Sequence, residues 1–212
     1  MTARGEILTR VRAAIAGAEP GGPIPRAYRT ATDDGLEVFL DRLAHYDAVT
    51  HVVDLAGLTE TIRTALNNRG QVVVPAGIPS TWTTGIEAPL TDDPPLTHKE
   101  IDASDGVITT CALAIAQTGT MVLDAGPGMG RRALTLLPDY HLCVVRADQV
   151  VGLVPEAVAG LAEAARTPGR PITFISGPSA TVDIEMTRVR GVHGPRNLEV
   201  IVVAGAPPAE AT

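Results

Sequence analysis

Aromatic side chains are scarce in this sequence: phenylalanine, tryptophan and tyrosine together make up 3% of its 212 residues. Hydrophobic residues nevertheless reach 45%, which excludes wholesale disorder and requires a core of valine, leucine, isoleucine and alanine. Such a core suits a parallel sheet whose two faces are both covered by helices. The length fits one α/β domain with a modest N-terminal extension.

Cysteine is scarce as well. The two cysteines, Cys111 and Cys143, form neither a CxxC pair nor any other cluster spacing. An iron–sulfur cluster usually needs four cysteine ligands, so we expect no cluster and no other cofactor in this chain. A structural disulfide between the two is disfavoured in a cytosolic protein, where thiols are kept reduced.

Positive charge and long apolar runs are lacking too. The net charge is −7 and no stretch concentrates lysine or arginine, which argues against binding to nucleic acid or to an anionic membrane surface. No segment is long enough without a charge or a helix breaker to cross a bilayer. The first residues also lack the apolar region of a signal peptide. We therefore expect a cytoplasmic protein that neither binds nucleic acid nor inserts into a membrane.

The N-terminal part predicts two helices. Apolar residues at helical spacing indicate a first helix over residues 4–17, and a proline- and glycine-rich stretch at 19–25 then breaks regular structure. A second helix is expected over 36–43. Its candidate caps are Thr32, Asp33 and Asp34. The sequence leaves open whether these helices pack on the main domain or on another subunit.

From residue 51 onward, short apolar strands alternate with amphipathic helices. This alternation predicts right-handed crossovers and an open, mostly parallel sheet flanked by helices. We expect an N-terminal helical extension and linker at 1–48, an α/β domain at 49–204 and a flexible tail at 205–212. Strands are expected at 51–53, 71–74, 107–110, 120–123, 141–145, 172–175 and 198–203, helices at 58–66, 154–161 and 182–189, a left-handed helix end at Gly70 and a long loop at 76–100.

The most specific local pattern follows the expected strand at 172–175. The segment Ser176–Thr181 would open the next helix, because Gly177 permits a tight turn and the proline after it is tolerated at a first helical position. The backbone N–H groups of a helix start, with the hydroxyls of Ser179 and Thr181, would then form an anion site. The alternative is that one of these hydroxyls merely caps the helix.

Two other turns offer polar groups. Gly119 would let a ligand approach the backbone between the hydroxyls of Thr118 and Thr120, although a plain turn would look the same. His193 lies between glycines in a loop suited to proton transfer or carboxylate binding. Arg196 in the same loop would fork onto a carboxylate. The alternative for His193 is a solvated imidazole bonded to its own loop.

Two weaker patterns complete the candidates. The segment Asp124–Arg132 is rich in glycine and ends in two arginines, as a loop that grips a carboxylate or phosphate would. It lacks the lysine and the spacing of a P-loop, and a flexible surface loop is the alternative. His141 and Cys143 share one face of a strand, but two ligands are too few for a metal. We assign both to the core and expect no metal site.

Three segments together resemble the lactate-utilisation (LUD) domain: Val107–Asp124, Gly130–His141 and the run from Ser176 to Arg196. Their order and spacing make the resemblance specific, and it covers about residues 70–203. Where the family usually has an acidic residue before Thr-Gly-Thr, this chain has Gln117.

The resemblance implies a fold like that of the sugar-phosphate isomerase and CoA-transferase superfamily, and membership of the lactate-utilisation protein C family. Members of that family act beside two iron–sulfur proteins, A and B, in oxidising L-lactate to pyruvate, so the clusters are expected in those partners. We expect a non-redox subunit whose candidate loops converge on one pocket for a small carboxylate or phosphate, where strand carboxyl ends meet loops. The alternatives are a free-standing isomerase or CoA-transferase-like enzyme and a structural adaptor.

Overall fold

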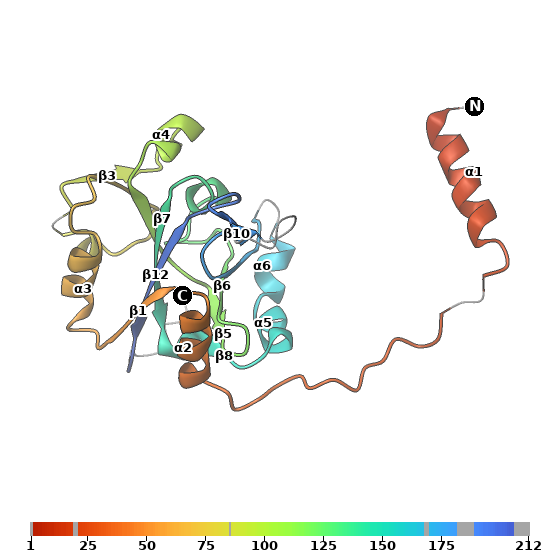
Figure 1. Cartoon of the computed structure of the whole chain (residues 1–212), viewed down its shortest axis with the longest axis horizontal. Helices are drawn as coiled ribbons and strands as arrows, with labels where there is room; N and C mark the ends of the chain where they lie inside the picture. Colours follow the sequence, from red (N-terminus) through yellow and green to blue (C-terminus); the bar gives the residue numbers. More distant parts are fainter. Residues whose placement is uncertain (1, 19–20, 85, 168–169, 182–188, 206–212) are drawn as a thin grey trace.

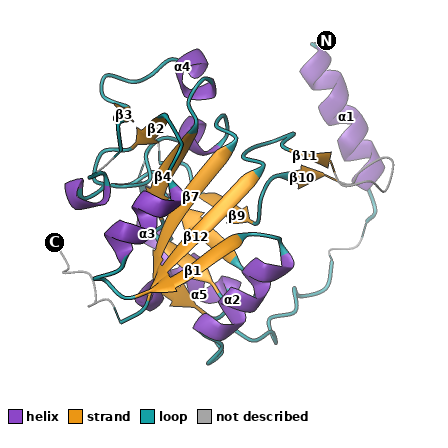
Figure 2. Cartoon of the chain, turned by 60° about the vertical axis from the view of Figure 1, so that its left-hand side comes forward, coloured by secondary structure: helices purple, strands orange, loops and turns teal. Residues whose placement is uncertain are grey.

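The computed structural model describes residues 2–18, 21–84, 86–167, 170–181 and 189–205. Its centre is a six-stranded sheet in the order β1-β12-β7-β4-β2-β3, and every neighbouring pair in it runs parallel. A second sheet has the order β8-β5-β6-β9 and contains both parallel and antiparallel pairs. Figure 2 shows the twisted central sheet from one edge strand, β3, to the other, β1. The predicted α/β fold with a mostly parallel sheet is confirmed.

Two adjacent inner strands of the central sheet are buried on both faces. They are β7 (Tyr140–Arg146) and β12 (Asn197–Val203). Along β12, Val200 and Val202 belong to the core on one face, while Ile201 belongs to the core on the other. Successive side chains of a strand point to opposite faces, so an unbroken aliphatic run supplies both cores at once.

Helices cover both faces of the sheets (Figure 1). On one face of the central sheet lies α3 (Leu58–Ala65), which contributes buried leucine and isoleucine. On the other face lie α2 (Leu36–His45) and the second sheet. The outer face of the second sheet is covered by α5 (Val154–Gly160), followed by α6 (Ala162–Arg166). The layers are therefore helix, sheet, sheet and helix.

The two predicted N-terminal helices have different surroundings. In α2, Phe39 and Leu43 are fully buried in the core with β6, β7 and β12. By contrast, α1 (Ala3–Ile15) has no buried residue and stands away from the domain at the end of an extended arm (Figure 1). The expected caps of α2 are wrong, because its N-cap is Gly35 and makes no side-chain hydrogen bond. The hydroxyl of Thr32 instead accepts from the nearby Asp34 N–H.

Three expectations about the connections are corrected. The left-handed residue after α3 is Asn68, with φ 65°, rather than Gly70, and asparagine tolerates that conformation well. The expected loop at 76–100 contains β3 (Ala88–Thr91), which the sequence did not predict because a proline lies within it. Proline is tolerated there because β3 is an edge strand. The link after β4 contains β5 (Leu113–Ile115), a strand of the second sheet.

The helix expected at 182–189 is wrong at its last residue, Val189, and the segment expected to open it ends in a strand. Residues Ala180–Thr181 form β10, which pairs antiparallel with β11 at Val189–Arg190. Residues 182–188, including most of the expected helix, and the tail from residue 206 lie outside the described residues. Apolar residues at this spacing are compatible with either structure, and β-branched residues at both ends favour strands.

The remaining elements are short. They are β1 (Val49–Val53), β2 (Gln71–Val74), η1 (Ser80–Trp82), α4 (His98–Asp102), β4 (Gly106–Thr110), β6 (Thr120–Leu123), η2 (Arg132–Thr135), η3 (Ala147–Gln149), β8 (Val150–Val151) and β9 (Thr173–Ser176).

Because α2 closes one core, truncating its buried aromatic should unfold the whole domain more easily. We expect Phe39→Ala to lower the free energy of unfolding by about 3–5 kcal/mol, the range for buried aromatic truncations. Tyr28→Ala, which truncates an aromatic residue that is 56% exposed on the arm, should change it by less than about 0.5 kcal/mol. Urea denaturation followed by circular dichroism measures both. Equal effects of the two substitutions would contradict the assignment of α2 to the core.

Candidate functional site

A cavity of about 250 Å3 lies at the amino ends of β7 and β12, beneath the segment that follows β9. Its wall combines hydroxyls, two imidazoles and one guanidinium with aliphatic and proline surfaces. The lining residues are Arg132, Thr135, Leu136, His141, Thr173, Phe174, Ile175, Ser176, Gly177, Pro178, Ser179, Ala180, His193, Gly194, Pro195 and Leu198.

Four of the nine residues proposed from the sequence line this cavity: Ser176, Gly177, Ser179 and His193. The other five, Thr118, Gly119, Thr120, Thr181 and Arg196, lie outside its lining. A second cavity, of about 630 Å3, lies at the carboxyl edge of the parallel sheet, where we expected the site; the glycine-rich segment, Asp92 and Arg170 line it. The first cavity is not at that edge. It lies at the opposite edge because β9 belongs to the second sheet and runs antiparallel to β6, so its carboxyl end is not bound by the rule for parallel strands.

The threonine turn is joined to the cavity by a chain of hydroxyls. The Oγ1 atoms of Thr118 and Thr120 are 2.7 Å apart, and Thr120 Oγ1 is 2.7 Å from Ser176 Oγ. Thr120 is buried, whereas Ser176 lines the cavity. The turn therefore positions Ser176 from behind the cavity wall.

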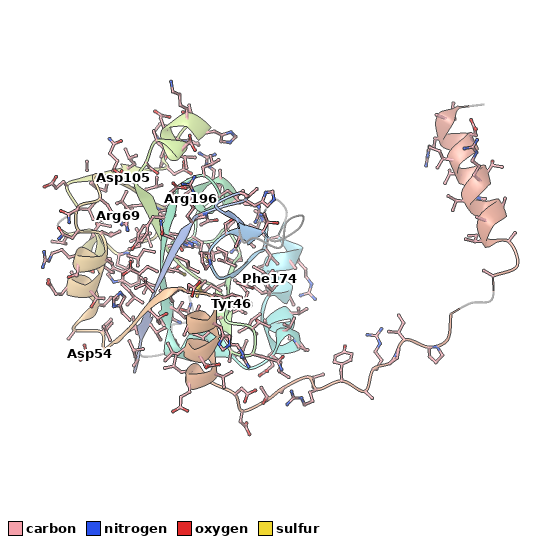
Figure 3. All side chains as sticks on the ribbon, viewed as in Figure 1. Tyr46, Asp54, Arg69, Asp105, Phe174 and Arg196 are labelled. Atoms are coloured by element: carbon pink, nitrogen blue, oxygen red, sulfur yellow. The ribbon has the colours of Figure 1, made fainter. Side chains whose placement is uncertain are left out.

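Gly119 and Gly177 serve close packing against α2. Both have positive φ, of 59° and 81°. A Cβ on Gly119 would lie 2.6 Å from Cβ of Arg42, and one on Gly177 would lie 2.6 Å from Cβ of Tyr46. Tyr46 is labelled in Figure 3 at the upper end of α2. The structure thus gives Gly119 a packing role where we expected the approach of a ligand.

Ser179 holds together the two loops that close the cavity. Its backbone N–H donates to the Pro195 carbonyl at 2.8 Å, and its carbonyl accepts from the Gly191 N–H at 2.9 Å. Its hydroxyl accepts from the backbone N–H of His193 at 3.1 Å. Because β10 replaces the expected start of a helix, these loops are fixed by a short strand pair. The proposed helix N-terminal anion site therefore loses its basis.

Arg132 brings a positive charge to the cavity. Its Nη1 donates to Thr173 Oγ1 at 2.8 Å, which orients the guanidinium on the wall. No aspartate or glutamate occurs among the described residues that line the cavity. A wall with one guanidinium, several hydroxyls and no described carboxylate favours an anion.

The other candidate arginines are held in ion pairs. Arg131 makes two hydrogen bonds to the Asp92 carboxylate, at 2.8 and 2.9 Å. Burial acts in the opposite direction, yet the Arg131 hydrogen bonds keep the pKa of Asp92 below its usual value. Arg196, labelled in Figure 3, lies 3.5 Å from the exposed Asp139 carboxylate. Of the two arginines that end the glycine-rich segment, only Arg132 reaches the cavity.

His141 brings a neutral imidazole to the inner wall. It is 1% exposed, and its Nε2 is 2.7 Å from the hydroxyl of Thr109. Burial lowers the pKa of His141 to about 4, so the ring is uncharged at neutral pH. The assignment of His141 to the core is confirmed, but the sequence did not indicate that it also reaches a cavity. Its place follows from the register of β7 beside β4, which pairs Val107 with His141.

The two cysteines are buried next to each other on the sheet. The neighbouring Cys143 thiol and burial both raise the pKa of Cys111, so the Cys111 thiol is protonated at neutral pH. Within the described ranges, no group of three histidine, cysteine or acidic residues lies close enough to hold a metal ion. Over the same ranges, no helix is both long and apolar enough to pass through a bilayer.

The depressed pKa of His141 predicts a pH-dependent stability. Histidine in an unfolded chain titrates near 6.5, so the stability from the neutral ring is complete above pH 6.5 and is lost as the pH falls toward 4. Between pH 7.5 and 5 this loss is about 2 kcal/mol.

We expect His141→Gln to reduce the pH dependence of the free energy of unfolding by about that amount. The unmodified chain, unfolded under the same conditions, is the control. Urea unfolding at the two pH values measures the difference. A His141→Gln protein with unchanged pH dependence would refute the buried neutral imidazole.

Comparison with known proteins gives the family. The model of the LUD domain matches residues 81–203. Lactate utilization protein C of Deinococcus radiodurans is 49% identical over 201 residues, covering 93% of this chain and 94% of its own. Lactate utilization protein C of Geobacillus kaustophilus is 33% identical over 192 residues, covering 81% and 79%.

A solved structure agrees with these relatives. The crystal structure of a DUF162 family protein from Deinococcus radiodurans superposes with a TM-score of 0.69 at 47% identity, covering 79% of this chain and 94% of that one. The sequence motifs, the parallel sheet and these relatives all agree: the chain belongs to the LUD domain family and, within it, to the lactate utilization protein C family.

Proposed function

We propose that this chain is a cluster-free subunit of a multi-subunit system that oxidises L-lactate to pyruvate, and that its cavity binds a small carboxylate. Relatives that cover most of the chain are named lactate utilization protein C, which supports a role in lactate utilisation. The iron–sulfur clusters of the proposed system lie in the partner proteins A and B. We place the assembly in the cytoplasm.

The observation that carries the proposal is the charge of the cavity. The chain as a whole is acidic, at −7, yet among the described lining residues the cavity holds Arg132 and no carboxylate. Its volume of about 250 Å3 lies just below the range of roughly 300–1,000 Å3 that drug-sized ligands occupy. A cavity with a positive charge and this volume suits a carboxylic acid of a few carbon atoms.

The wall offers a distinct role for each kind of group. Arg132 would donate to the carboxylate, and the hydroxyls of Ser176 and Ser179 would donate to its remaining lone pairs. The neutral ring of His141 would face a hydroxyl or keto oxygen without adding charge. Leucine, isoleucine and proline surfaces would enclose the short carbon chain. This arrangement binds and orients a ligand.

Removing the guanidinium from the cavity should weaken anion binding. We expect Arg132→Ala to lower the affinity for L-lactate or pyruvate by about 1.5–3 kcal/mol, the range for a hydrogen bond to a charged group. Arg196→Ala removes an equal charge from a residue paired with Asp139 outside the cavity, so it should change affinity by less than about 0.5 kcal/mol.

Titration calorimetry with L-lactate, pyruvate and inorganic phosphate measures these affinities. A folded protein that binds none of the three, or equal losses in both variants, would overturn the assignment of the cavity. Turnover of a phosphosugar by the isolated chain would favour the isomerase class instead.

The role in lactate oxidation is tested in cells. A clean deletion of the gene, in a host without a second lactate oxidase, should abolish growth on L-lactate and leave growth on pyruvate unchanged, because only the oxidation step is lost. A plasmid copy should restore growth, and an Arg132→Ala copy should restore it poorly. Normal growth of the deletion strain on L-lactate would rule out the role.

A further inference from the structure

Helix α1 has an apolar row with nothing packed on it. Ile7, Leu8, Val11 and Ile15 fall within one arc of about 100° when each residue advances by 100° around the helix. They are 61%, 38%, 50% and 61% exposed, and no residue of α1 is buried. A helix of 13 residues is marginal by itself in water and gains most of its stability by packing an apolar face. The row therefore requires a partner surface.

The arm keeps this helix away from its own domain. Residues 21–31 run without helix or strand, and every one of them is exposed. Pro23 and Pro25 fix their own backbone angle and force the residues before them into extended conformations, so this part of the arm is a semi-rigid spacer. At its inner end Thr32 packs against Gly152, just before α5. Figure 1 shows the spacer leading outward from that point.

Charge distinguishes the arm from the domain. Five arginines and two glutamates give residues 1–31 a charge of +3, which leaves −10 for residues 32–212. Arg10 and Arg12 lie on either side of the apolar row at 100° per residue. A basic helix with an apolar row fits an acidic surface that has an apolar row of its own.

The domain, which is acidic as a whole, exposes an apolar row on α5. Val154 and Val158 are 41% and 57% exposed and lie one turn apart, the same spacing as Ile7, Val11 and Ile15. Glu163 on the next helix is exposed and lies 3.7 Å from Arg166 of the same helix. Rows at this spacing pack as ridges into grooves.

We propose that the apolar row of α1 docks on the Val154–Val158 face of α5 in a second copy of this chain. Every copy carries one basic helix and, on an acidic domain, one apolar receptor row, so two copies can exchange arms around a two-fold axis and form both contacts at once. The dimer is independent of the ligand in the cavity.

Substitution of one residue on each side of α1 tests the interface in the full chain. Val11→Asp places a charge in the apolar row, while Thr9→Asp makes the same change in charge on the opposite side of the helix. Burial of a valine is worth roughly tenfold in affinity and the dimer contains two such contacts, so Val11→Asp should weaken dimerisation roughly a hundredfold. Thr9→Asp should weaken it less than about threefold. Sedimentation velocity over a dilution series measures both constants.

The receptor is tested in the same way. Val158→Asp should weaken the dimer as much as Val11→Asp, and raising the salt concentration should weaken it moderately, because charges on the two surfaces attract. Thermal unfolding by circular dichroism establishes that each variant still folds. A monomeric unmodified chain overturns the proposal, whether α1 is then free, held on its own domain or inserted into anionic vesicles. So does a dimer that Val11→Asp leaves intact.

Discussion

The burial of β7 and β12 on both faces is the constraint on which the rest of the structure depends. Two adjacent strands without a solvent face need aliphatic side chains at nearly every position, which explains a rich core with few aromatic residues. Polar side chains on these strands must find partners, and the bond between His141 and Thr109 is one result. At the amino ends of the two strands, loops replace the covering layers, and the cavity forms there.

The sequence predicted the aliphatic strands well, because burial on both faces leaves an unbroken run that few other structures use. The sequence-based prediction failed for two strands. Pro89 argued against a strand at β3, and the apolar spacing up to Val189 was compatible with a helix as well as with a strand. The candidate site was half predictable. Ser176, Ser179 and His193 lie in polar turns that the sequence singled out, and all three line the cavity.

The rest of the site depends on three-dimensional placement. Arg132 reaches the cavity only because η2 crosses the amino end of β7, and Arg131 beside it turns instead to Asp92. Two adjacent arginines in the sequence do not show which of them will reach the cavity and which will pair with Asp92. In the proposed function, the cavity at the amino ends of these strands is the place where the chain holds a small acid.

The close contact between Gly177 and Tyr46 makes α2 a mechanical link. The arm begins at the amino end of this helix, and Tyr46 at its carboxyl end presses on a glycine of the cavity wall. Ten residues of α-helix form a nearly incompressible rod about 15 Å long. A side chain at Gly177 would displace Tyr46 and this rod, so the cavity wall and the helix that joins the arm to the domain are packed as one unit.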